Sequence, residues 1–159
     1  MLRISKLTDY GTVILAALAA PPDRRHTAAE VAGTTRLALP TVSKILKSFH
    51  RAGLVTSVRG SHGGYRLARP PAEISAAAII DAIEGPLAIT ECSGDHNACD
   101  LAASCSTGGS WQQINAAIRR SLDGISLAQL SGQEAVALWR LELPAAYRGP
   151  SAARTGGRL

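Results

Sequence analysis

The hydrophobic spacing of the chain changes from helical to alternating between Thr27 and Leu67, with polar turns between the segments. Thr27 and Glu30 have the spacing of a capping box, which predicts a short helix over residues 28–34. A second helix is predicted to begin at Pro40, because proline suits the first helical position. Its apolar residues recur at helical intervals, and they are Val42, Ile45, Leu46 and Phe49. The pattern therefore predicts two helices joined by a short turn.

A β-hairpin is predicted directly after these helices. Gly53 ends the helical pattern, and residues 54–58 are mostly β-branched and alternating. The glycine-rich residues 60–64 favour a turn, and residues 65–67 alternate again. A helix-turn-helix followed by a hairpin is typical of a winged helix. The expected fold class is therefore mostly α with a small β-hairpin wing.

The remainder of the chain also favours helices. A helix is predicted from Thr8, as its N-cap, to about residue 20, where Pro21 and Pro22 stop it. Hydrophobic residues make up 46% of the 159 residues but aromatic residues only 4%, and such Ala-rich chains favour helices. This length suits one ordinary domain, or a small domain with an appended helix. No apolar run approaches the roughly 18 residues of a membrane span, and the N-terminus is a poor signal peptide, so we expect a cytoplasmic protein.

Positive charge is concentrated in the N-terminal part. Residues 1–70 carry 11 Lys and Arg against three Asp and Glu, a net charge of +8, whereas residues 71–130 carry −5. Such an excess is expected of a protein that binds a phosphate backbone, although a well-solvated surface is the alternative. The sequence contains no Ser/His/Asp set, P-loop or dinucleotide fingerprint, so we do not expect an enzyme.

The polar face of the second predicted helix supplies candidate DNA contacts. The short hydroxyl side chains of Thr41 and Ser43 suit base edges and phosphates, whereas Lys44, Lys47 and Arg51 suit phosphates. A glycine-rich hairpin tip would let basic side chains enter a minor groove or follow a phosphate strand. The candidate contacts in the hairpin are Arg59, Ser61, His62 and Arg66. We predict binding to double-stranded DNA; the alternative is a protein-interaction module with a solvated helix.

Residues 92–106 form a polar segment that contains all three cysteines of the chain. Cys92, Cys99 and Cys105 are separated by six and five residues, with almost nothing apolar between them, so the segment cannot fold by its own burial. Three thiolates form a site of soft ligands for an iron-sulfur cluster or a zinc ion with one further ligand. The residues leave open a cluster, zinc with His96 as fourth ligand, and free thiols. A disulfide framework is disfavoured because three cysteines cannot all pair within one chain.

An amphipathic helix is predicted from Ser110 until Gly124. Its apolar residues are Trp111, Ile114, Ile118 and Leu122. A single appended helix of this kind needs a partner, and a homodimer that reads palindromic DNA is its common use.

These predictions give an organisation of the whole chain. The expected parts are a winged helix over residues 1–70, a supporting helix and connection over 71–91, the cysteine loop over 92–106, a dimerisation helix over 107–130, and a partly disordered tail over 131–159 with one short helix at 134–143.

Residues 1–130 resemble the Rrf2 family of bacterial transcription regulators. The resemblance rests on Leu-Thr-Asp-Tyr-Gly at 7–11, on Leu-Pro-Thr-Val-Ser-Lys at 39–44, on the wing sequence at 59–67, and on the spaced cysteines. It implies a homodimeric winged helix whose long C-terminal helices cross beside an iron-sulfur cluster, [2Fe-2S] or [4Fe-4S], that modulates DNA affinity. The details are most similar to the branch that controls the SUF cluster-assembly genes. We therefore expect a repressor that senses cluster status, the alternative being a regulator that binds zinc or senses oxidants or nitric oxide.

The resemblance also bears on the fourth ligand. IscR-like members have a histidine three residues after the last cysteine, but this chain has Gly108 there. NsrR-like members complete the site with an aspartate of the partner subunit near the start of the first helix, and Asp9 matches it. Asp9 is therefore the first candidate and His96 the second. A carboxylate at a helix N-terminus also interacts favourably with the helix dipole, which is an alternative role for Asp9.

Overall fold

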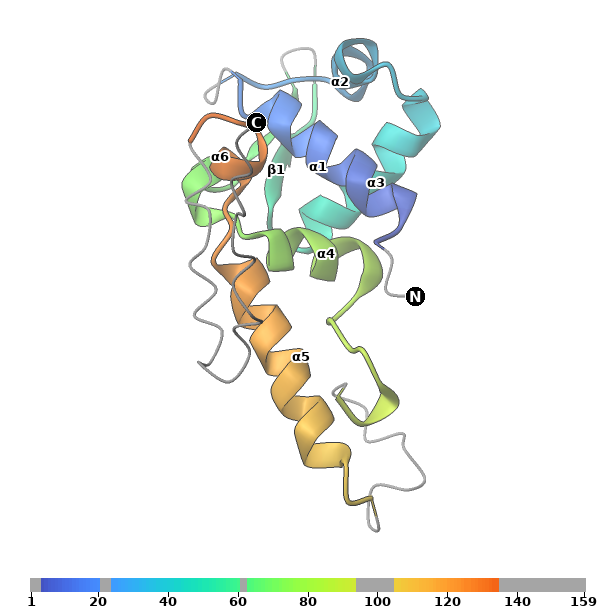
Figure 1. The fold of residues 1–159 in the computed structure, drawn as a ribbon. Helices are drawn as coiled ribbons and strands as arrows, with labels where there is room; N and C mark the ends of the chain where they lie inside the picture. Colours follow the sequence, from blue (N-terminus) through green and yellow to red (C-terminus); the bar gives the residue numbers. More distant parts are fainter. Residues whose placement is uncertain (1–3, 21–23, 61–62, 94–104, 135–159) are drawn as a thin grey trace, which may run out of the picture.

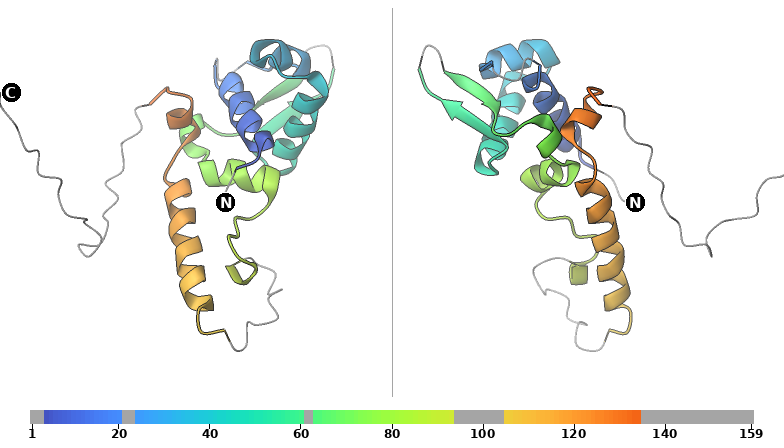
Figure 2. Two further views of the ribbon diagram at one scale, coloured as in Figure 1. Left: turned by 45° about the vertical axis from the view of Figure 1, so that its right-hand side comes forward. Right: turned by 90° about the vertical axis from the view of Figure 1, so that its left-hand side faces the viewer.

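A computed structural model of the protein describes residues 4–20, 24–60, 63–93 and 105–134. Its elements are α1 (Lys6–Leu18), α2 (Ala28–Thr35), α3 (Leu39–Arg51), β1 (Val55–Val58), β2 (Gly64–Leu67), η1 (Pro71–Glu73), α4 (Ala76–Glu84), η2 (Glu91–Ser93), α5 (Gly108–Asp123) and α6 (Leu127–Leu130). Most helices pack into one body, from which α5 projects, with the η2 turn beside it (Figure 1). The hairpin leaves this body in another direction (Figure 2). None of the described helices is long and apolar enough to cross a membrane.

The helix-turn-helix forms where the capping and proline signals of the sequence predict it. The capping box between Thr27 and Glu30 opens α2, and Pro40 lies in the first turn of α3. The prediction for α1 is wrong at its start, because Ser5 is the N-cap and its side chain accepts the Thr8 N–H. Thr8 lies inside the helix and is only 3% exposed. Its hydroxyl donates to the Glu84 carboxylate of α4, a partner that the sequence pattern does not reveal.

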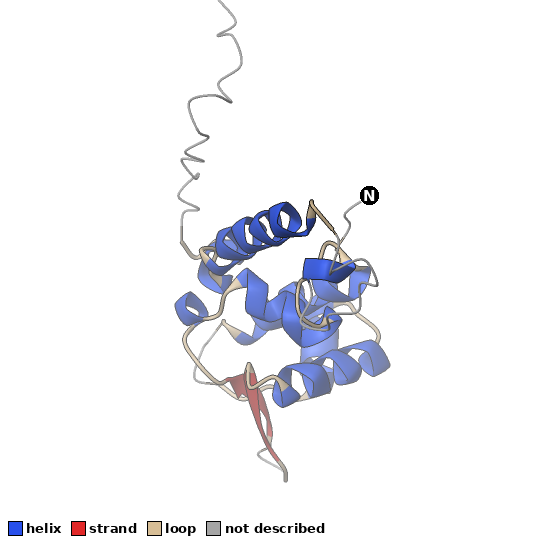
Figure 3. Ribbon diagram, turned by 90° about the horizontal axis from the view of Figure 1, so that it is seen from below, coloured by secondary structure: helices blue, strands red, loops and turns tan. Residues whose placement is uncertain are grey.

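The wing is a two-stranded antiparallel hairpin in which Val55 pairs with Leu67 (Figure 3). Its second strand is tied to the segment before α2, because His26 and Tyr65 exchange backbone hydrogen bonds of 2.9 and 2.8 Å. Gly64 has a φ of +143°, and a Cβ there would lie 2.7 Å from the His26 carbonyl oxygen. This close approach requires glycine at position 64.

The chain after α5 returns to the helical body. Gly124 ends α5 as the sequence predicts, and the segment expected as a dimerisation helix over 107–130 is divided into α5 and α6. The Ala76 N–H donates to the Ile125 carbonyl at 2.8 Å, and the Leu127 N–H donates to the Ile74 carbonyl at 2.7 Å. Leu127 is fully buried in the same core as Phe49 of α3. The expected helix at 134–143 lies almost wholly outside the described residues.

Candidate nucleic-acid interface and cysteine loop

The basic residues of α3 face solvent because the opposite side of the helix packs on the core. Val42, Ile45, Leu46 and Phe49 are buried, so the opposite side faces solvent. Thr41 and Ser43 are half-buried, and the exposed side chains are those of Lys44, Lys47 and Arg51. The N-cap residue, Ala38, forms no side-chain cap, which leaves backbone N–H groups of the first turn free for an anion.

An open groove of about 760 Å³ separates α3 from β2. Ser43, Lys44, Lys47 and Arg51 line it, and the structure adds His50 and Tyr65, which the sequence analysis did not single out. His50 follows Lys47 by three residues on the same helical face, and this spacing could have identified it. In the part of the chain that the structure describes, no carboxylate forms an ion pair with the basic residues of this groove. The groove therefore presents uncompensated positive charge.

The wing extends this basic surface. Arg59, which directly follows β1, and Arg66 on β2 are both exposed. Arg66 lies opposite Thr56 in the hairpin register. The other two candidates, Ser61 and His62, lie at the hairpin tip outside the described residues.

Cys105 is the only proposed thiol ligand whose side chain the structure describes. It is half-buried just before α5, with Sγ 3.4 Å from Thr107 Oγ1. Hydrogen bonds from the Thr107 side chain and from the backbone N–H groups of Thr107 and Gly108 lower the pKa of the Cys105 thiol. Thiolates are the form that binds metals, so this position fits a metal or cluster ligand. No three His, Cys, Asp or Glu side chains within the described ranges come together as a metal site.

The other proposed ligands come from separate parts of the chain, and the described residues do not bring them together with Cys105. The backbone of Cys92 lies in η2, while the Cys92 side chain, Cys99 and His96 are not among the described groups. Asp9 is exposed in the first turn of α1. It borders a pocket of about 530 Å³ that Leu122 of α5 and Leu130 of α6 also line. Among the described residues, the Asp9 carboxylate has no side-chain hydrogen bond or ion pair.

The outer face of α5 carries an apolar stripe. Trp111 is 40% exposed and Ile114 is 44% exposed, while Ile118 and Leu122 are half-buried. Large apolar side chains in a row on a projecting helix are typical of an interface with another protein. The fold and the basic groove together define a winged helix-turn-helix protein with an appended amphipathic helix.

The chain belongs to the Rrf2 family, whose profile, described as "Iron-dependent Transcriptional regulator", matches residues 4–133. It is 34% identical over 102 residues to the HTH-type transcriptional regulator IscR of Aliivibrio salmonicida, and this match spans 64% of the chain and 60% of that relative. The structure is similar to that of CymR, the global cysteine regulator of B. subtilis, with a TM-score of 0.64 at 29% identity over 84% of this chain and 99% of that one. It is also similar to T. potens IscR, with a TM-score of 0.61 at 30% identity over 84% and 89% of the two chains.

These relatives confirm three expectations from the sequence. The family resemblance is confirmed, and so is the winged-helix fold with a small hairpin. The expectation of a transcriptional regulator rather than an enzyme is also confirmed, because the relatives are transcriptional regulators.

Proposed function

We propose that this protein is a DNA-binding transcriptional repressor whose affinity for its operator depends on an iron-sulfur cluster at the cysteine loop. The observation that carries the DNA-binding part is the uncompensated basic groove between α3 and β2. Phosphate contacts supply most of the affinity of such proteins, and they require cations that carboxylates have not already neutralised.

The contacts follow from the position of each side chain. The N-terminal half of α3 enters the major groove, where Thr41 and Ser43 contact base edges. Lys44, Lys47 and Arg51 bind phosphates beside it. The wing contacts the neighbouring backbone or minor groove through Arg59 and Arg66, and the candidates at its tip are Ser61 and His62.

The functional unit is a homodimer that binds a palindromic operator. Support comes from the exposed stripe of α5, since burying Trp111 and Ile114 against a second copy removes apolar surface from water. A two-fold dimer presents two copies of α3, and its DNA site has matching symmetry.

Cys92, Cys99 and Cys105 bind the cluster, and Asp9 of the partner subunit supplies the fourth ligand. When bound, the cluster supplies bonds to thiolates and thereby orders a loop that has little apolar content of its own. The lowered pKa of the Cys105 thiol supports this role, as does the free Asp9 carboxylate. We further propose that the regulated genes are those of SUF cluster assembly, as the sequence resemblance implies.

The second candidate function is a regulator whose cysteines bind zinc or react directly with oxidants or nitric oxide. The same lowered pKa of Cys105 favours it, because a thiolate is also the reactive form of cysteine.

One experiment separates these functions. Anaerobically purified protein is analysed for colour, iron, sulfide and zinc, and its DNA site is selected from a randomised duplex pool. A brown protein with iron and sulfide that selects a two-fold symmetric site supports the proposal. Colourless protein with zinc supports the second candidate.

A second experiment tests cluster control of DNA binding. Replacing all three cysteines by Ala is expected to change operator affinity roughly 5- to 150-fold, the usual range of allosteric coupling. Unchanged affinity would contradict cluster control.

A further inference from the structure

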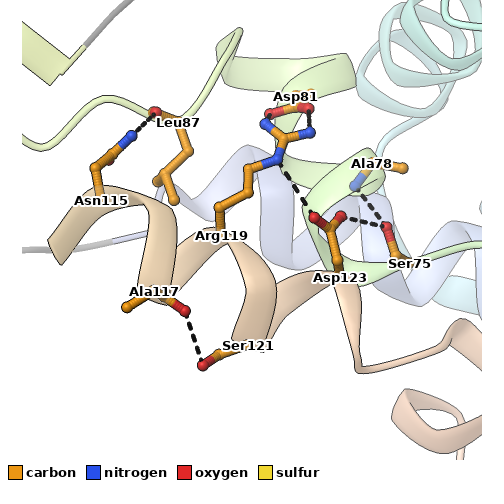
Figure 4. A network of polar contacts seen from close by, with 9 residues as sticks. All are labelled: Ser75, Ala78, Asp81, Leu87, Asn115, Ala117, Arg119, Ser121 and Asp123. Atoms are coloured by element: carbon orange, nitrogen blue, oxygen red, sulfur yellow. Dashed lines mark hydrogen bonds and ion pairs between the residues drawn. The ribbon is translucent and has the colours of Figure 1, made fainter. Parts of the chain in front are cut away.

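The side chain of Asn115 joins the middle of α5 to the segment that leads into the cysteine loop. Its Nδ2 group donates to the carbonyl oxygens of Leu87 at 3.0 Å and Ser93 at 3.3 Å, and its Oδ1 accepts the Ile89 N–H at 3.3 Å. Figure 4 shows the side chain reaching from the helix to Leu87. One amide thus satisfies three backbone groups of a segment outside the regular α-helices and strands.

The segment held in this way contains the first cysteine. Ser93 closes a tight turn on Thr90, because the Ser93 N–H and Oγ–H both donate to the Thr90 carbonyl at 2.9 Å. Cys92 lies within this turn, immediately before the carbonyl that Asn115 holds. The position of the Cys92 backbone relative to α5 therefore depends on Asn115.

The same face of α5 is attached to the helical body one turn further on. Arg119 follows Asn115 by four residues and binds Asp81 of α4. Helix α4 in turn packs against α1 and α3. Asn115, which holds the cysteine turn, and Arg119, which binds α4, thus lie on the same face of one helix.

We propose that Asn115 is a positioning residue, which seats the Cys92 turn on α5 so that the three cysteines can share one metal centre. The inference rests on the proposed function, since it assigns Asn115 a role toward a ligand of that site. Asn115 contacts the backbone that carries a ligand and does not itself bind the metal. Groups of this kind commonly change metal affinity 10- to 100-fold when they are replaced.

The first measurement is amide hydrogen exchange on the full, metal-free chain. Asn115→Ala removes the acceptor of the Ile89 N–H, so this amide is expected to exchange at least fivefold faster, as for a lost hydrogen bond. Gln113→Ala is the matched control, because Gln113 is exposed on the same helix and forms no side-chain hydrogen bond to the described residues of the segment. It should leave Ile89 unchanged within twofold. Equal exchange in the wild type and Asn115→Ala would overturn the inference.

The second measurement is an anaerobic titration with Co²⁺, followed by thiolate-to-metal charge-transfer absorption. Asn115→Ala and Asn115→Asp are both expected to weaken Co²⁺ binding at least tenfold, because neither can donate to Leu87 and Ser93. Far-UV circular dichroism checks that both variants are folded, and Gln113→Ala should bind as the wild type does. Wild-type affinity in Asn115→Asp would overturn the positioning role. A wild type without thiolate absorption would overturn the cysteine site of the proposed function, while the exchange measurement still decides whether Asn115 seats the turn.

Discussion

The guanidinium of Arg119 binds both carboxylate oxygens of Asp81, with distances of 3.1 Å from Nη1 to Oδ1 and 2.6 Å from Nη2 to Oδ2. This pair joins α5 to α4, and the side-chain hydrogen bonds that Arg119 donates to Asp81 raise the pKa of Arg119. Asp123 extends the contact, since its carboxylate lies 3.6 Å from Arg119 Nε and accepts the Ser75 hydroxyl at 3.3 Å (Figure 4). The attachment of α5 to the helical body is therefore polar on this face.

Arg119→Gln is expected to lower the free energy of unfolding by about 1 kcal/mol, because a bidentate pair that is partly exposed is lost. Arg120→Gln is the control, since Arg120 is exposed on the same helix and forms no ion pair within the described residues. It should change stability by less than about 0.5 kcal/mol. Urea denaturation measures both effects, and equal stabilities of the two variants would show that the pair contributes nothing.

Lys47→Ala should weaken binding to all DNA sequences alike, because Lys47 is assigned to a phosphate. The slope of log affinity against log salt should become less steep by about 1. Fluorescence anisotropy at several salt concentrations measures the slope, with Arg120→Gln as a charge-matched control away from α3. An unchanged slope in Lys47→Ala would remove this residue from the interface.

Thr41→Ala and Ser43→Ala should instead change which bases are preferred.

Ile114→Asp is expected to yield a folded monomer. Ile114 is exposed on α5, so the charge costs little within one chain but is buried without a partner in a dimer. Sedimentation velocity at micromolar concentration measures the state, and Gln113→Asp on the same helix is the control. A dimeric Ile114→Asp protein would place the interface elsewhere.

Glu84→Gln should make stability less dependent on pH in the acidic range. Hydrogen bonds from the Thr8 hydroxyl and the Ser5 N–H lower the pKa of the Glu84 carboxyl in the folded protein. The carboxylate therefore stabilises the fold above its pKa in the unfolded chain, and this contribution is lost as the pH falls through the lower folded value.

The difference in unfolding midpoint between the wild type and Glu84→Gln should accordingly be largest near neutral pH and shrink on acidification. Glu73→Gln provides the control, because Glu73 is exposed and forms no ion pair with another described residue. Parallel pH curves for the wild type and Glu84→Gln would contradict the assignment.

Most of the winged helix-turn-helix is encoded by local sequence signals, and for that reason it was predictable. The capping box at Thr27, Pro40 in the first turn of α3 and the glycine-rich hairpin act over a few residues, and each forms in the structure. The exposure of the basic side chains of α3 was also predictable, because the helical spacing of its apolar residues leaves the opposite face to solvent. Tyr65 joins the groove only because the wing lies beside α3.

Short-range patterns in the amino-acid sequence settled the order of the helices, the hairpin and the polarity of each helix face. The packing of distant segments decided the rest. Thr8 is capable of capping a helix, but the Glu84 carboxylate binds its hydroxyl within the fold. Leu127 fits an extended contact helix, yet it is 0% exposed because the chain turns back to the core after α5 ends at Gly124. Asn115 looks like any polar residue of an amphipathic helix, and its role arises only because the fold places the half-buried backbone groups of Leu87 and Ile89 beside it.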